Sequence, residues 1–259
     1  MIVVSFSGGR TSAYMSYKLI EKHGKENLFF VFANTGKENI ETLDFIQECS
    51  LQWGIHVNWI EADVSEKKGV GTTYKIVTYE TASRNGEPFS AVNSKYGIPN
   101  KSFPHCTREL KERPIKKFVQ DIFGNEYVMA IGIRIDERTR VNRNRAEKEK
   151  WIYPLIDDFP ATKKMVNDFW SHQPFQLGIP DYLGNCDLCW KKSLKKRLRI
   201  IQEFPEKADW WEGQELKDEY VFDRDGNSIA MLRKMADEMS LQGDLFENEI
   251  GCSCFSNIV

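Results

Sequence analysis

From the sequence we expect neither an export signal nor a segment that inserts into a bilayer. No apolar run approaches the ~20 residues that cross a membrane. The amino terminus has no basic flank, and its apolar run is too short for a secretory signal. We therefore expect a cytoplasmic protein with no membrane partner. In that compartment, cysteines are more often free, metal-binding or catalytic than joined in disulfides.

An excess of either charge is also absent. The chain has 36 Lys and Arg against 38 Asp and Glu, a formal net charge of -2. This balance excludes a surface that is polycationic throughout, but it leaves local basic segments open. We find no internal repeat and no low-complexity segment. A chain of 259 residues with 41% hydrophobic and 29% charged residues is typical of one large folded domain, or of one domain with a subdomain.

Apolar runs alternate with helical patterns over the first part of the chain. The apolar runs predict strands at residues 2–6, 28–32, 55–60, 127–133 and 151–155. Helical periodicity predicts helices from residue 12 and at residues 42–53 and 107–123. Continuous apolar strands separated by helices indicate a parallel sheet that is covered on both faces. We therefore predict a doubly wound α/β domain with a mostly parallel, five-stranded sheet.

Two segments depart from this alternation. Residues 62–105 are rich in glycine, proline and asparagine, and so long an irregular segment in a compact domain is usually a functional loop. After Pro160 the patterns are helical, with helices expected at residues 162–173, 188–203, 209–220 and 228–241. We place a boundary near residue 155, between an α/β domain over 1–155 and a mostly helical subdomain over 156–259.

A turn rich in serine and glycine joins the first strand to the first helix. It runs Ser5-Phe6-Ser7-Gly8-Gly9-Arg10-Thr11-Ser12. Glycines let the backbone approach an anion, and serine hydroxyls and free N–H groups at a helix start can then bind it. The alternative is a tight turn with a serine cap. The segment has neither the Gly-Lys-Ser/Thr of a Walker A loop nor the Gly-x-Gly-x-x-Gly of a dinucleotide site.

Five of the six cysteines come from three segments that are distant in sequence. Cys186 and Cys189 form a Cys-x-x-Cys, and Cys252 and Cys254 lie near the carboxyl terminus. Cys106 follows His105 and precedes Arg108 at an expected helix start, which predicts a lowered pKa for its thiol. These cysteines fit a shared iron–sulfur centre, a structural zinc site or a set of unligated redox thiols.

The sixth cysteine and a tryptophan pair fit packing roles. Cys49 lies in an ordinary helical setting, so we assign it to the core. Trp210 and Trp211 are expected to anchor the helical part, with stacking on a nucleobase as the alternative.

Two segments are rich in basic residues. The run from Arg134 to Lys150 holds seven basic and four acidic residues, and the run from Lys191 to Arg199 holds six basic residues and no acid. A solvated helix face explains such runs in most proteins. The alternatives are a bound phosphate or sulfate group, or a nucleic-acid backbone on the run from Lys191 to Arg199, whose affinity would depend on salt.

Several motifs together resemble one family. The Ser-Gly-Gly segment is similar to the PP-loop of the adenine nucleotide α-hydrolase superfamily. Further matching segments lie at residues 32–38, 78–89, 106–114, 132–137 and 183–189. Together they resemble the phosphoadenosine phosphosulfate (PAPS) reductase-like family of bacteria and their phages. Thr11 stands where the ATP pyrophosphatases of the superfamily carry Asp, which argues against their reaction.

The resemblance implies where a nucleotide would bind. It implies a strand order of 3-2-1-4-5, which places the ends of strands one and four side by side at a switch point, where open α/β sheets bind ligands. An adenine nucleotide, either PAPS or ATP, would lie there. Arg134 would bind its phosphate, with an ion pair to Asp136 or Glu137 as the alternative. The nucleotide-binding residues would be Ser5, Ser7, Gly8, Gly9, Arg10, Thr11, Ser12, Ala33, Asn34, Thr35, Gly132 and Arg134.

The resemblance also implies roles for the cysteines. Reductases of this superfamily that carry a [4Fe-4S] cluster use an adjacent cysteine pair and a later Cys-x-x-Cys. Here His105 and Cys106 stand in place of the pair. Cys106, Cys186 and Cys189 would then be ligands. The fourth ligand would be Cys254 or Cys252, or the iron would stay open to sulfide or substrate. The remaining carboxyl-terminal cysteine would be the free nucleophile, by analogy with the reductases.

Three functions remain open from the sequence. The first is thiol-dependent reduction of a nucleotide-bound sulfonate to sulfite, with a thioredoxin-like electron donor. In that reaction Cys252, Cys254 and Arg134 are the catalytic candidates. The second is ATP-dependent sulfur transfer to a nucleic acid or a small molecule at the cluster. The third is a non-catalytic nucleotide-binding protein.

Overall fold

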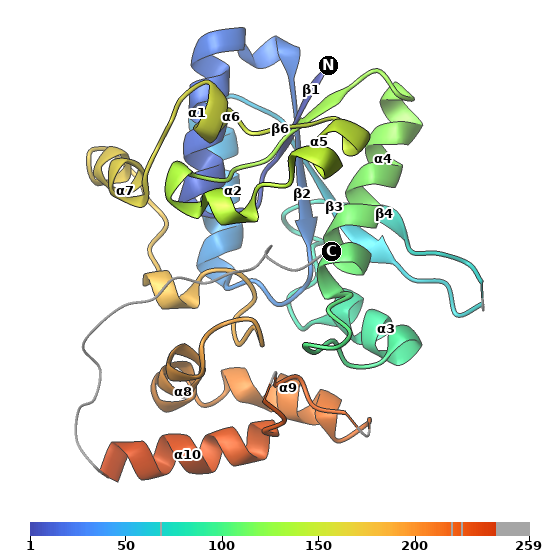
Figure 1. The fold of residues 1–259 in the computed structure, drawn as a ribbon, viewed down its shortest axis with the longest axis vertical. Coiled ribbons are helices and arrows are strands. Elements are labelled where there is room, and N and C mark those ends of the chain that lie inside the picture. Colours follow the sequence, from blue (N-terminus) through green and yellow to red (C-terminus); the bar gives the residue numbers. More distant parts are fainter. Residues whose placement is uncertain (68, 219, 224, 242–259) are drawn as a thin grey trace.

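A six-stranded mixed sheet forms the centre of the computed structural model, which describes residues 1–241 except 68, 219 and 224 (Figure 1). The order across the sheet is β4-β3-β2-β1-β5-β6. Only β4 is antiparallel to its neighbour. The strands are β1 (Ile2–Ser5), β2 (Leu28–Asn34), β3 (Val57–Asp63), β4 (Thr73–Val77), β5 (Val128–Ala130) and β6 (Trp151–Ile152).

Helices cover both faces of the sheet. Val4 belongs to a large buried cluster that includes side chains of α1 (Arg10–His23) and α2 (Ile40–Trp53). Val3 belongs to a second cluster that includes side chains of α4 (Arg113–Phe123). Successive strand residues therefore point to opposite apolar layers, as the near-continuous apolar sequence of β1 requires. The α-helices are α1 (Arg10–His23), α2 (Ile40–Trp53), α3 (Glu87–Tyr96), α4 (Arg113–Phe123), α5 (Arg143–Glu149), α6 (Pro154–Asp157), α7 (Lys163–Ser171), α8 (Leu194–Glu203), α9 (Lys207–Glu215) and α10 (Ile229–Leu241). Shorter turns are η1 (Lys25–Asn27), η2 (Arg108–Glu112), η3 (Ile135–Arg140) and η4 (Asp181–Leu183).

The switch point lies beside β1. This strand pairs in parallel with β2 on one side and with β5 on the other. The chain therefore leaves β1 in one direction along the sheet and later returns to its opposite side. The carboxyl ends of β1 and β5 are neighbours there, and a crevice opens at such a point.

The segment at residues 62–105 is more regular than we predicted. It contains β4 and α3, so the sheet has six strands and not five. The sequence did not predict β4, because this edge strand has partly exposed or exposed side chains and no apolar run. The sequence did not predict α3, because Pro88 lies in its first turn and glycines lie directly before and after the helix.

The carboxyl-terminal helices lie beyond the carboxyl ends of the parallel strands (Figure 1). The expected helix at residues 188–203 begins later, at Leu194, because Ser193 caps it by accepting a hydrogen bond from the Lys196 N–H. One buried cluster contains both Val4 of the sheet and Trp211 of α9. The boundary near residue 155 stays a prediction. Across the described part of the chain, no helix is both long enough and apolar enough to cross a bilayer.

Candidate active site

The β1–α1 loop combines a tight turn with an open surface. Gly8 has a φ of +76°, and a Cβ there would lie 2.6 Å from Cγ2 of Thr42. This glycine is therefore required by the approach of α2. Gly9 has an extended backbone, and a Cβ there would meet only the Ser7 Oγ, at 3.9 Å. Gly9 lines a cavity and Gly8 does not, so only Gly9 leaves room for a ligand.

Hydrogen bonds hold this loop in shape. The backbone N–H and the hydroxyl of Ser7 both donate to the Ser12 Oγ, at 3.2 and 3.0 Å. The Ser12 hydroxyl donates to the carbonyl of Gly9 at 3.0 Å. No side chain caps the first turn of α1, and no acidic residue lies in it. The helix start can therefore offer its N–H groups and its dipole to an anion.

The end of β5 faces this loop. A Cβ on Gly132 would lie 3.4 Å from the Cα of Ser12, so this residue lies directly against the start of α1. Arg134 donates from Nη1 to the Thr11 Oγ1 at 2.8 Å, and it also pairs with Asp136 and Glu137. Burial opposes ionisation of Asp136, but the hydrogen bond from Arg134 lowers the pKa of its carboxyl. The ion pairs that we expected as the alternative role of Arg134 are therefore present. Arg134 also contacts the β1–α1 loop through Thr11.

A cavity of about 1320 Å³ contains most of the expected nucleotide site. Its lining includes Ser5, Ser7, Gly9, Arg10, Thr11, Ser12, Ala33, Gly132 and Arg134. Basic side chains outnumber acidic ones along its wall, and both basic runs contribute to it. Arg140 and Arg145 come from the first run, whereas Lys195, Lys196 and Arg199 come from the second. Two segments that are far apart in sequence therefore supply positive charge to one cavity.

Arg10 contacts protein groups in this structure. Its Nη1 pairs with Asp181 at 2.9 Å, and its Nη2 donates to the carbonyl of Leu177 at 2.7 Å. Burial opposes ionisation of Asp181, but Lys163 and Arg10 lower the pKa of its carboxyl. Arg10 thus ties the β1–α1 loop to the cavity wall at residues 177–181, an arrangement that the sequence did not predict.

Asn34 and Thr35 lie outside the cavity lining. The Asn34 amide donates to Glu61 at 2.6 Å and to the carbonyl of Ser83 at 2.8 Å. Thr35 Oγ1 donates to Glu38 at 2.7 Å and lies 3.5 Å from the Cys186 sulfur. The hydrogen bonds of Asn34 fix the end of β2, and Thr35 places that end beside the segment that contains Cys186 and Cys189.

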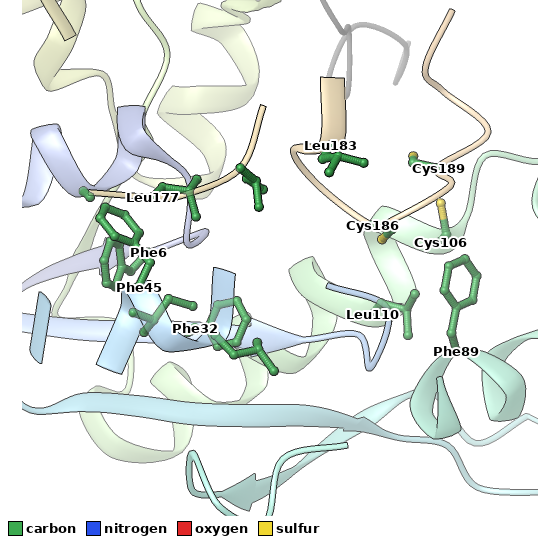
Figure 2. Close-up of a cluster of buried hydrophobic side chains, with 14 of the residues drawn as sticks. Phe6, Phe32, Phe45, Phe89, Cys106, Leu110, Leu177, Leu183, Cys186 and Cys189 are labelled. Carbon is green, nitrogen blue, oxygen red and sulfur yellow. The ribbon is translucent and has the colours of Figure 1, made fainter. Parts of the chain in front are cut away.

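Three of the predicted cysteine ligands lie together. Figure 2 shows Cys106, Cys186 and Cys189 at one end of the largest buried apolar cluster. All three are buried, and none is joined in a disulfide within the described part of the chain. Cys189 is close enough to Cys106 and to Cys186 for a negative charge on it to raise the pKa of each. Cys49 is buried in α2, as expected.

The expected lowering of the Cys106 pKa is wrong. Burial raises the pKa of this thiol, and the positive charge of Lys191 only partly opposes the rise. Arg108 instead pairs with the buried Glu109 at 2.7 Å. Burial also lowers the pKa of His105, which favours its neutral form. Neither sequence neighbour therefore supplies the positive charge that we predicted.

Buried polar contacts dock the Cys-x-x-Cys onto the end of β2. Lys37 and Asp187 form an ion pair at 2.9 Å, and both side chains are about nine-tenths buried. The Asp187 N–H donates to the carbonyl of Lys37 at 2.8 Å, and the Trp211 indole donates to the Asp187 carboxylate at 2.8 Å. The sequence reasoning missed these residues, although the acid between two paired cysteines was a usable signal.

Two buried side-chain nitrogens, each in a residue next to a cysteine in the sequence, have no complete hydrogen bond within the described residues. The Trp190 indole faces Cys106, where it favours the thiolate, but its Nε1 has no hydrogen-bond partner of normal geometry within the described residues. The same holds for Nε2 of His105. Among the residues described, no three His, Cys, Asp or Glu side chains converge tightly enough to hold a single metal ion. Cys252 and Cys254 lie outside the described residues.

The chain is similar to one protein family and to several individual proteins. Residues 1–172 match the phosphoadenosine phosphosulfate reductase domain family. An uncharacterized nin region protein of Escherichia phage lambda is 36% identical over 200 residues, which cover 75% of this chain and 67% of that protein. Two uncharacterized proteins of Methanocaldococcus jannaschii are 25% and 22% identical over 82% and 81% of this chain. The alignments cover only 40% and 46% of those archaeal proteins.

Proposed function

Because the chain belongs to the phosphoadenosine phosphosulfate reductase domain family, we propose that it is an enzyme that binds an adenine nucleotide on the β1–α1 loop and acts on sulfur. One observation carries the proposal. The loop, Gly132 and Arg134 line one cavity, and Asn185 lines it directly before Cys186. A nucleotide phosphate on the loop would therefore lie in the same cavity that reaches the cysteine segment.

The first reaction to test is reduction of a nucleotide-bound sulfonate. A thiolate attacks the sulfonate sulfur, an S–S bond forms, and the S–O bond to the phosphate breaks. The nucleotide leaves with the electron pair of that bond, and the α1 amides and Arg134 stabilise its phosphate charge. A second thiol, from a thioredoxin-like donor, then attacks the first sulfur. Sulfite leaves and a disulfide remains, so two thiols supply the two electrons.

The nucleophile would come from the carboxyl-terminal cysteines. Cys252 and Cys254 are the candidates, because Cys106, Cys186 and Cys189 are buried and none of them lines the cavity. A nucleophilic thiolate needs a lowered pKa and access to the substrate. Burial and neighbouring negative charges instead raise the pKa of the Cys106 and Cys186 thiols.

The buried cysteines suit a [4Fe-4S] cluster. Cys106, Cys186 and Cys189 would be three ligands and Cys254 the fourth, with Cys252 as the alternative. Cluster sulfurs accept hydrogen bonds. The Trp190 indole N–H, which has no complete hydrogen bond within the described residues, lies beside Cys106 and could donate to such a sulfur. With a cysteine as the fourth ligand the cluster would be fully coordinated, whereas without one it would supply an iron position open to sulfide or substrate. A structural zinc ion on the same cysteines is the alternative.

A second reaction is favoured by the size of the cavity. Small-molecule sites usually enclose about 300–1,000 Å³, and this cavity of about 1320 Å³ exceeds that range. It has room for a nucleotide and a second substrate. ATP would then activate an oxygen of that substrate as a nucleotidyl ester, with pyrophosphate leaving. A sulfur nucleophile would next displace AMP.

Product analysis separates the candidates. The anaerobically purified full chain is incubated with PAPS, thioredoxin and a dithiol, or with ATP and sulfide. Sulfite and adenosine 3′,5′-bisphosphate would identify the reductase, whereas AMP and pyrophosphate would identify the ATP-dependent reaction. Nucleotide binding by calorimetry without any product would indicate a non-catalytic protein. Failure of PAPS and ATP to bind would contradict the proposed nucleotide site.

A further inference from the structure

The cavity offers more positive charge than one phosphate group needs. Beyond the β1–α1 loop, Arg140, Arg145, Lys196 and Arg199 also line it. Carboxylates hold several of these side chains in place, such as Glu112, which pairs with Arg145 at 2.7 Å. Basic side chains still outnumber acidic ones along the wall. The cavity therefore suits a ligand with several negative charges in a row.

Two arginine–aromatic pairs also face the cavity. The Arg145 guanidinium lies 4.4 Å from the Trp151 ring centre, and the Arg199 guanidinium lies 4.2 Å from the Tyr182 ring centre. All four residues line the cavity. One pair belongs to α5 and β6, and the other to η4 and α8. Flat cationic and aromatic faces of this kind stack on nucleobases, whereas their cations contact the neighbouring phosphates.

We propose that this cavity binds a single strand of nucleic acid, with its phosphates on the basic residues and a base against Tyr182. Single strands fit better than duplexes, because a recessed cavity can accept splayed bases that a duplex keeps stacked inside. The proposal goes beyond nucleotide binding on the β1–α1 loop, and either of the two can hold without the other. Strand binding would select the ATP-dependent reaction as the one to pursue.

Fluorescence anisotropy with the full chain tests the proposal. The probes are labelled single-stranded DNA and RNA of about 12 nucleotides and a duplex of the same sequence, each at several salt concentrations. We expect the single strands to bind more tightly than the duplex. Lys196→Glu should weaken their binding about tenfold and reduce the salt slope by about 0.7 per lost phosphate contact. The control Lys234→Glu makes the same charge change at an exposed residue of α10 outside the cavity and should change affinity less than about twofold.

A second pair of variants separates base stacking from general attraction between charges. Tyr182→Leu removes the ring and should weaken binding at least about fivefold, whereas Tyr182→Phe retains the ring and should bind like the parent. Polyglutamate, which has charges but no bases, should not displace the strand at equal charge. Equal losses in Lys196→Glu and Lys234→Glu, equal binding of the duplex, or displacement by polyglutamate would overturn the proposal. PAPS and ATP titrations on the same samples report the nucleotide site separately.

Discussion

Gly8 and Gly9 are adjacent in the loop but satisfy different constraints. Gly8 combines a positive φ with contact to α2, whereas Gly9 has an ordinary backbone and faces the cavity. The sequence alone gives both the same interpretation, as a flexible Gly-Gly turn. Only the packing of Thr42 against Gly8 distinguishes the glycine that the fold requires from the glycine that a ligand requires.

This difference predicts opposite phenotypes for two variants. Gly9→Val should leave the free energy of unfolding nearly unchanged, because its extended backbone suits valine, and should weaken nucleotide binding by placing methyl groups in the phosphate site. Gly8→Ala should lower the free energy of unfolding by about 1–3 kcal/mol, through backbone strain and overpacking. Calorimetric titration and urea unfolding measure the two effects. Unchanged nucleotide affinity in folded Gly9→Val would contradict the placement of the phosphate.

At the scale of elements, one arginine joins α1 to the cavity wall. Arg10 binds two backbone carbonyls and Asp181 in residues 177–181, and the Trp170 indole of α7 donates to the Arg10 carbonyl at 2.9 Å. The wall continues through η4 to Gly184 and Asn185. The start of α1 is therefore fixed to residues 177–181, a part of the wall that precedes Cys186 in the chain.

Without the Arg10 contacts, residues 177–185 of the cavity wall should open to solvent more often. Arg10→Ala should speed hydrogen exchange at residues 177–185 several-fold, because the carbonyls and Asp181 lose their shared donor. Lys18→Ala, which removes an exposed ion pair within α1, is the matched control and should leave that segment unchanged. Mass spectrometry of the exchanged peptides measures both. Unchanged exchange at residues 177–185, with weaker nucleotide binding, would show that Arg10 acts as a direct ligand instead.

A buried ion pair joins α8 to the segment before α10. Arg197 and Asp223 are each about 1% exposed or less and are in contact. Burial opposes ionisation of Asp223, but Arg197 and the Asn227 N–H hold the pKa of its carboxyl below the usual value of about 3.9. Because the folded pKa is the lower one, the ionised pair stabilises the fold above about pH 4. This contribution is lost as the pH falls through the folded value.

Acid should therefore destabilise the parent through this pair. The free energy of unfolding should fall more steeply below about pH 4 in the parent than in Asp223→Asn, which has no carboxyl to protonate. Arg197→Met should cost about 3 kcal/mol near neutral pH, because it leaves Asp223 buried without its cation. Denaturant unfolding across the pH range measures both effects. Parallel pH profiles for the parent and Asp223→Asn would exclude Asp223 as the titrating group.

At the scale of the whole molecule, the cysteine centre depends on segments that are distant in sequence. Cys106 lies just before η2, a π-helical turn, and Cys186 and Cys189 lie between η4 and α8. An isolated β-bridge between Glu38 and Cys186 and the Lys37–Asp187 ion pair bring the second segment to the end of β2. The three thiols are neighbours only when the sheet and the carboxyl-terminal segments are packed together.

The cluster proposal predicts a coloured protein. The anaerobically purified chain should be brown and contain iron and acid-labile sulfide, and Cys186→Ser should lose most of both. Cys49→Ala changes a buried cysteine in α2 and should retain them. Iron and sulfide analysis with an absorption spectrum measures the outcome. A colourless parent with one equivalent of zinc would contradict the cluster.

The sequence by itself determined the parts of this protein that depend on local patterns. Continuous apolar runs specified β1 and β2, and Thr162 marked the start of α7, where its side chain accepts from the Met165 N–H. The Ser-Gly-Gly turn and the motifs around it were sufficient for the family. These signals need no distant partner, because side-chain period and capping are properties of neighbouring residues.

Only the tertiary structure decided the features that depend on distant partners. β4 gains its order from pairing with β3, and Arg108 is paired by Glu109 rather than available to Cys106. The two basic runs became parts of one cavity wall only through folding. The physical reason is that burial and charge pairing depend on which surfaces meet, and those surfaces come from segments that are far apart in the chain.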